Sequence, residues 1–135
     1  MHTLKLLSAL AAALTLTGCH SATIAATISN RTSAPLSLIE FDYPSASFGT
    51  QTLAPGQDFH YRFKIIGSGA TTLLWTDAAR HDHKSSGPTL RDGDEGKLTI
   101  TFNPDANPTN PGANPANPEA NPTWNLELLH PASGS

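Results

Sequence analysis

The chain has 135 residues, enough for one small domain, and 8 Lys and Arg stand against 11 Asp and Glu for a formal net charge of −3. This balance is not basic enough to indicate a nucleic-acid-binding protein. Cys19 is the single cysteine, so no intrachain disulfide can form and core burial and backbone hydrogen bonds must hold the fold.

The first segment of the chain has the plan of an export signal. The amino terminus and Lys5 supply positive charge, and an apolar run rich in Leu and Ala follows over residues 6–17. A membrane-spanning helix needs about 20 apolar residues, more than this run provides. We therefore expect a helical signal peptide over residues 1–18 and not a permanent transmembrane helix.

The signal ends in Leu16-Thr17-Gly18-Cys19, which resembles the lipobox of bacterial prolipoproteins. The resemblance implies cleavage between Gly18 and Cys19, a diacylglyceryl group on the Cys19 sulfur and a fatty acid such as palmitate on the new amino group. Several acyl chains would anchor the protein stably to a membrane. A cleaved, secreted protein with a free cysteine is the alternative.

The resemblance also bears on location, because His20 and not aspartate follows the cysteine. By the sorting preference of enterobacterial members, this residue favours the outer membrane. We therefore expect an envelope lipoprotein that faces the periplasm or the cell surface, joined to its folded domain by a tether at residues 19–22.

Alternating apolar and polar residues predict β-strands along the rest of the chain. Ser47–Thr50 is a candidate for a short additional edge strand, Leu53–Gly56 for a turn, and residues 67–69 for a tight hairpin. The polar stretch 77–96 is expected to be irregular. The six predicted strands are residues 23–30, 36–43, 59–66, 71–76, 97–102 and 124–130.

Two predicted strands carry opposite charges on their polar faces. Glu40 and Asp42 lie on one, and Arg62 and Lys64 on the other. Antiparallel pairing would place these charges opposite one another, a motif that contributes about 0.2–1 kcal/mol per pair. We therefore expect these two strands to be neighbours.

Residues 103–123 form three copies of an Asn-Pro heptad whose prolines exclude helix and sheet. We expect a disordered loop that joins the strand at 97–102 to the strand at 124–130, because loop-closure entropy grows only slowly with length. These two strands should pair. Residues 131–135 are expected to be a disordered tail.

The strand count and the Gly- and Pro-rich turns predict an all-β fold. We expect a small immunoglobulin-like β-sandwich of six or seven antiparallel strands, formed by residues 23–102 and completed by the strand at 124–130. A small barrel is the alternative.

Histidines supply the preferred candidate metal site. His81 and His83 would lie on the same side of an extended segment, and His60 or His130 could add a third ligand for copper or zinc. The carboxylates at residues 92–95 could bind calcium but lack the spacing of a twelve-residue calcium loop, so a turn is the preferred interpretation.

No pattern typical of a catalytic centre is present: there is no Gly-x-Ser-x-Gly elbow and no His and Asp placed to suggest a triad. The prediction is a non-catalytic binding module, lipid-anchored at Cys19, with no cofactor beyond the covalent lipid. Its expected partners are the membrane and another envelope protein. An envelope metal-binding protein and a structural surface component remain alternatives.

Overall fold

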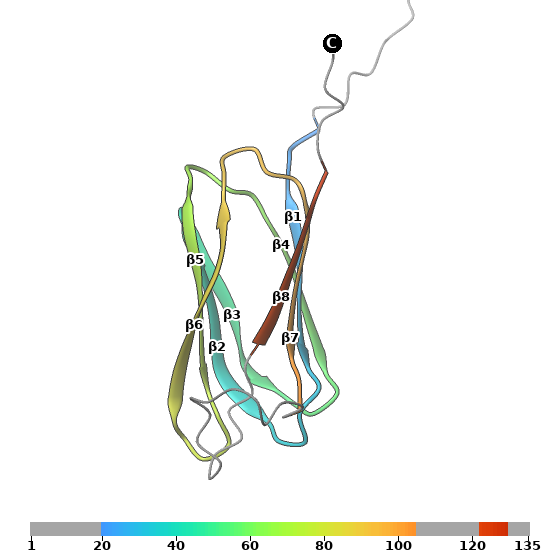
Figure 1. Cartoon of the computed structure of the whole chain (residues 1–135), viewed down its shortest axis with the longest axis vertical. Helices are drawn as coiled ribbons and strands as arrows, with labels where there is room; N and C mark the ends of the chain where they lie inside the picture. The colour runs from blue at the N-terminus through green and yellow to red at the C-terminus, as the bar shows by residue number, and fades with distance from the viewer. Residues whose placement is uncertain (1–19, 105–121, 130–135) are drawn as a thin grey trace, which may run out of the picture.

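The computed structural model describes residues 20–104 and 122–129, and every regular element within these ranges is a β-strand (Figure 1). The predicted signal helix, most of the Asn-Pro repeat and the tail lie outside these residues. The strands are β1 (Ile24–Asn30), β2 (Leu36–Tyr43), β3 (Ala46–Leu53), β4 (Asp58–Phe63), β5 (Gly69–Thr76), β6 (Asp82–Leu90), β7 (Gly96–Phe102) and β8 (Pro122–Leu128).

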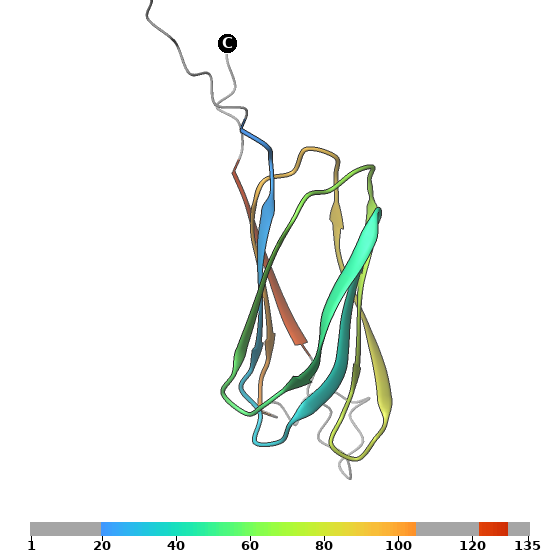
Figure 2. The same cartoon turned by 180° about the vertical axis from the view of Figure 1, so that it is seen from behind.

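The strands form two four-stranded sheets packed as a sandwich (Figures 1 and 2). We name the sheet with the order β4-β1-β7-β8 the first sheet and the sheet with the order β3-β2-β5-β6 the second sheet. Neighbouring strands are antiparallel except β1 and β7, which are parallel. The predicted all-β sandwich is confirmed, with eight strands in the described residues and one parallel pair.

Apolar side chains from both sheets fill the space between them. On β7, Leu98, Ile100 and Phe102 are fully buried, as the alternation of apolar and polar residues predicts. Ile24 and Ile28 of β1 are also fully buried. Buried apolar area is the main stabilising contribution in such a core, at about 25 cal/mol per Å². The alternating pattern therefore identified the inward face of both central strands of the first sheet.

Side-chain contacts also close the two open sides of the sandwich. On one side the Phe48 ring of β3 stacks on the Tyr61 ring of β4 at 4.3 Å between centroids. On the other side Trp124 of β8 donates a hydrogen bond to the Ser85 hydroxyl of β6 at 3.2 Å. A side chain at Gly87 would lie 2.5 Å from the Trp124 ring, so glycine makes room for it.

Pairing of the strands on either side of the repeat is confirmed. β7 and β8 run antiparallel from Gly96 opposite Leu128 to Phe102 opposite Pro122. Trp124, Leu126 and Leu128 of β8 pack against the core as partly buried side chains. A long insertion between two neighbouring strands is compatible with the fold because its closure costs little additional entropy.

The predicted pairing of the charged strands is wrong. β2 pairs with β3 and β5, while β4 pairs with β1 in the other sheet, so Arg62 and Lys64 do not lie opposite Glu40 and Asp42. A cross-strand charge pair contributes too little to choose among strands, and burial of the apolar faces decides the partner.

The hairpin predicted at residues 67–69 is also wrong, since this segment crosses from β4 in the first sheet to β5 in the second. The polar stretch predicted as irregular contains β6, an edge strand with one fully buried apolar residue, Leu90. Its remaining residues are polar or small, so no apolar alternation marks it. Ser47–Thr50 is confirmed as part of an edge strand, the longer β3.

The chain enters the sandwich at the end where β1 begins and β8 finishes (Figures 1 and 2). We call this the tether end. Backbone hydrogen bonds join its segments: Gly96 N–H donates to the Thr23 carbonyl at 3.2 Å and Leu129 N–H to the Glu95 carbonyl at 2.7 Å. Across residues 20–104 and 122–129, no helix has the length and apolar character needed to cross a membrane.

Candidate functional site

The predicted acylation and cleavage residues, Cys19 and Gly18, lie outside the described residues. Their nearest described neighbour is His20, whose Nε2 forms a hydrogen bond with the Glu95 carboxylate in the loop that precedes β7. β1 starts at Ile24. All eight described strands therefore follow the predicted cleavage point, and removal of residues 1–18 would take nothing from any of them.

His81 and His83 lie around one carboxylate at the opposite end of the sandwich. Asp77, just after β5, has its Oδ2 atom 2.8 Å from His83 Nε2 and 3.6 Å from His81 Nδ1. The His83 ring also stacks on the buried Trp75 ring, with centroids 5.2 Å apart. These contacts orient the β5–β6 turn.

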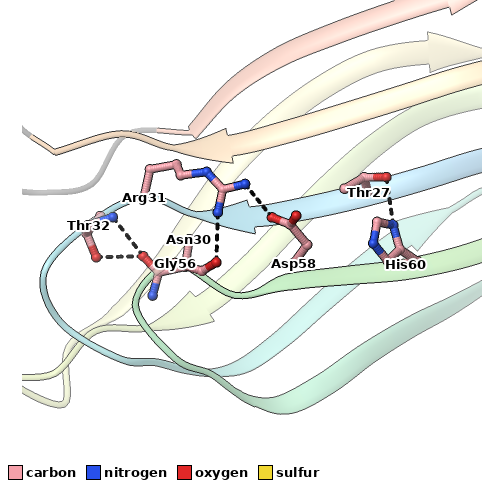
Figure 3. A network of polar contacts seen from close by, with 7 residues as sticks. All are labelled: Thr27, Asn30, Arg31, Thr32, Gly56, Asp58 and His60. Atoms are coloured by element: carbon pink, nitrogen blue, oxygen red, sulfur yellow. Dashed lines mark hydrogen bonds and ion pairs between the residues drawn. The ribbon is translucent and has the colours of Figure 1, made fainter.

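His60 does not join this group. It lies on β4 in the first sheet, where its Nδ1 is 3.0 Å from the Thr27 hydroxyl of the neighbouring strand (Figure 3). His130 lies outside the described residues. Among the residues that the structure describes, no three His, Cys, Asp or Glu side chains form a group that could hold a metal ion, and copper or zinc binding by His81 and His83 stays a prediction.

The acidic segment before β7 forms a turn. Asp94 Oδ2 accepts a hydrogen bond from the Arg91 N–H at 2.8 Å, and the Asp94 N–H donates to the Arg91 carbonyl at 3.0 Å. Gly93 has a φ of 82°, a conformation that glycine adopts at little cost. The preferred interpretation of this segment, a turn between strands, agrees with this geometry.

A polar network organises the end of the sandwich opposite the tether (Figure 3). Asn30 is fully buried; its amide donates to the carbonyls of Ala34 and Leu53 at 2.9 Å each, and its oxygen accepts from Thr32 N–H and Oγ1 at 3.0 and 2.7 Å. One side chain thus links the β1–β2 loop to the end of β3. Its role is structural, because every polar atom is used within the fold.

The exposed part of the same network is an ion pair. Arg31 donates to the Asp58 carboxylate at 2.7 Å and to the Gly56 carbonyl at 3.0 Å (Figure 3). Hydrogen bonding with Ser29, followed by Arg31, holds the pKa of Asp58 below its ordinary value of 3.8. Both side chains are exposed to solvent, so the pair contributes little to stability.

Two described residues other than glycine have a positive φ, Arg80 in the β5–β6 turn and Leu38 within β2. The φ of Leu38 is 48°, in the left-handed region that costs a residue other than glycine about 1–2 kcal/mol. The register between β2 and β5 shifts between Ser37 and Glu40, which marks a β-bulge. The bulge lets Leu36 and Ile39 both be buried although they are three residues apart.

The bulge leaves Leu38 pointing outward, with 57% of the residue exposed to solvent. Glycine is the residue usually found at a left-handed bulge position. A large apolar side chain there adds strain and gains little burial. Strained positions of this kind cluster at functional sites, so Leu38 is the candidate contact residue of the second sheet.

A hollow of about 290 Å³ adjoins Leu38 between β2 and β3. Glu40 lies on its rim and accepts a hydrogen bond from the Ser47 hydroxyl at 3.0 Å. Gly49 is required beneath it, since a Cβ atom there would lie 1.9 Å from the Ile39 carbonyl oxygen. The hollow thus combines one exposed apolar side chain, Leu38, with an acidic rim.

The acidic character of this face extends to Asp42, two residues along β2. Partial burial, followed by the nearby Glu40 carboxylate, raises the pKa of Asp42 above its ordinary value of 3.8, and Lys84 acts in the opposite direction. Sequence reasoning missed this site. The available signal was the three-residue spacing of Leu36 and Ile39, which breaks the period of two.

Within residues 20–104 and 122–129, the fold and these contacts define a β-sandwich of eight strands. No protein-family model matches the chain, and no curated protein matches it. The chain is similar to a solved structure described as "NMR structure of the protein from Eubacterium rectale", with 12% sequence identity and a TM-score of 0.47 over 63% of this chain and 82% of that chain.

Proposed function

We propose that this chain is a lipid-anchored bacterial envelope protein whose sandwich is a non-catalytic interaction module. The observation that carries the proposal is the position of the lipobox-like motif. Its cysteine lies immediately before the first described residue, His20, and the described strands all follow it. Acylation at Cys19 would thus anchor the folded domain through a short tether.

The anchor is tested by Cys19→Ser. This variant is expected to lose all incorporation of labelled palmitate in bacterial cells, because Cys19 is the only thiol in the chain. Its thermal unfolding transition should be unchanged, since β1 starts five residues later at Ile24. His20→Ala is the matched control and should still be labelled. Palmitate incorporation that persists in Cys19→Ser would refute the anchor.

The interaction surface that we propose is the bulge at Leu38 with its acidic rim. This surface lies on β2 close to where the strand starts, away from the tether end, so it would stay accessible to another envelope protein (Figures 1 and 2). The partner would present an apolar side chain to Leu38 and a hydrogen-bond donor or cation to Glu40. An apolar contact surrounded by a polar rim is the usual arrangement of a protein–protein interface.

The variant Leu38→Gly is expected to change stability and partner binding in opposite directions. The substitution removes about 1–2 kcal/mol of left-handed strain and adds about 0.5–1 kcal/mol of glycine entropy, so we expect unfolding free energy to rise by about 0.5 kcal/mol. Binding should be lost, because the exposed apolar side chain at the bulge is removed. The measurement is urea unfolding combined with in-cell photocrosslinking from position 51, opposite the bulge.

The control is Ile66→Ala, which removes an apolar residue of similar exposure, 65%, from the β4–β5 connection. It should leave crosslinking from position 51 intact. A crosslinked partner recovered equally from Leu38→Gly and from the unmodified chain would contradict the assignment of this surface. A decrease in stability in Leu38→Gly would contradict the argument from strain.

A further inference from the structure

A second surface lies on the outer face of the first sheet, at the tether end. It is a hollow of about 400 Å³ bordered by outward-facing residues of β1, β4, β7 and β8. Arg62, Ala25, Lys97 and Glu127 occupy four successive strands in one cross-strand row. The small side chain of Ala25 therefore separates two cations.

The distance across this row suits an anion. Two strand spacings separate Arg62 from Lys97, about 10 Å between their Cα atoms. Both side chains are long enough to reach a group held above Ala25. Thr23 adds a hydroxyl, which already accepts a hydrogen bond from Arg62 Nη1 at 3.1 Å and so holds the guanidinium over the hollow.

Glu95 and Glu127 also border the hollow, but neither forms an ion pair with Arg62 or Lys97. Glu95 is engaged by His20, and Glu127 accepts a hydrogen bond from Asn125 along its own strand at 3.3 Å. Glu127 also lies on the far side of Lys97 from Ala25. Throughout the described part of the chain, neither Arg62 nor Lys97 forms an ion pair with a carboxylate.

The tether determines where this hollow would lie. Three residues separate Cys19 from Thr23, and the four residue steps from Cys19 to Thr23 span at most about 14 Å when fully extended. The headgroup layer of a bilayer leaflet is about 5–7 Å thick, so an acylated Cys19 would hold the hollow near the headgroups. Leu129, 66% exposed at the same end, offers apolar surface toward the bilayer.

From this placement we infer that Arg62 and Lys97 bind the phosphate of an anionic lipid headgroup in the leaflet that holds the anchor. The inference rests on the proposed acylation of Cys19. Guanidinium and ammonium groups are the side chains that recognise phosphate oxygens by charge-assisted hydrogen bonds. The consequence is a fixed orientation of the sandwich, with its first sheet toward the lipid and Leu38 away from it.

The test measures the rate at which an aqueous acetylating reagent modifies Lys97. The acylated full chain is placed in nanodiscs of phosphatidylcholine, with or without phosphatidylglycerol, and modified peptides are quantified by mass spectrometry. Phosphatidylglycerol is expected to slow Lys97 acetylation about fivefold, the effect of about 1 kcal/mol per basic residue at an anionic surface. Lys84, on the second sheet, should be acetylated at the same rate in nanodiscs with and without phosphatidylglycerol.

Arg62→Gln is expected to remove most of the protection of Lys97, and Arg91→Gln, a matched loss of charge in the β6–β7 loop, should keep it. Equal protection in both variants would indicate a general surface effect and overturn the site. Protection by free inorganic phosphate in phosphatidylcholine nanodiscs, at the level produced by phosphatidylglycerol, would identify a free-anion site and overturn the headgroup assignment.

The mass of the peptide that begins at Cys19 reports acylation separately. An acylated chain with no protection of Lys97 overturns this inference and leaves the anchor intact. A chain without acyl groups overturns the anchor, and the headgroup assignment fails with it.

Discussion

Asn30→Ala is expected to lower the free energy of unfolding by about 3 kcal/mol or more, because it removes four hydrogen bonds and leaves buried polar groups without partners. The amide of Asn30 donates to the Leu53 and Ala34 carbonyls, and its oxygen accepts twice from Thr32. The Leu53 contact is buried, so water cannot replace it. A loss of this size is a large fraction of the 5–15 kcal/mol typical of a domain.

The measurement is urea unfolding followed by circular dichroism. Asn125→Ala, which removes an exposed asparagine on β8, is the matched control and should change stability by less than about 0.5 kcal/mol. The loss of stability in Thr32→Ala should lie between those of the other two variants, because this change removes the hydroxyl, one of the two donors to the Asn30 oxygen. Equal midpoints for Asn30→Ala and Asn125→Ala would show that the network does not hold the loops together.

Phe41→Ala is expected to destabilise the chain by about 4 kcal/mol, within the range for removing a buried aromatic side chain. Phe41 is fully buried on β2 in the second sheet. Its ring lies 5.6 Å from Phe63 and 6.1 Å from Trp124, both of the first sheet, and 4.9 Å from Phe48. Truncation would leave a cavity between the two sheets.

Phe41→Leu keeps most of the volume and is expected to cost about 1–1.5 kcal/mol, as volume-conserving substitutions do. Tyr61→Ala is the exposed aromatic control, since 43% of Tyr61 is accessible, and it should cost less than Phe41→Ala. The prediction is contradicted if Phe41→Ala unfolds at the same urea concentration as Tyr61→Ala. Both core variants should still accept labelled palmitate, because the signal and Cys19 are unchanged.

The presence of a strand could be predicted wherever apolar and polar residues alternate strictly. β7 buries every second residue, β1 does so from Ile24 to Ile28, and the partly buried residues of β8 also alternate with exposed ones. This succeeds because the period of two depends only on the local pleat of the strand. The same argument failed for β6, whose side chains are polar on both faces, since an edge strand needs backbone pairing on one side only.

The sequence by itself determined that the chain is an all-β protein, which strands would pair across the repeat, and that a lipobox-like motif precedes the first strand. These conclusions depend on local periods, proline content and one short motif. Only the tertiary structure decided which strands share a sheet, because partners such as β1 and β7 are far apart in the chain and no local pattern encodes their pairing.

The same reason applies to the two proposed surfaces. The strain at Leu38 comes from a bulge between β2 and β5, and the gap between Arg62 and Lys97 exists only because β1 places Ala25 between their strands. Residues that are distant in sequence are brought into one row by sheet order. Sheet order is set by burial of the whole core, so these surfaces could be recognised only in the folded chain.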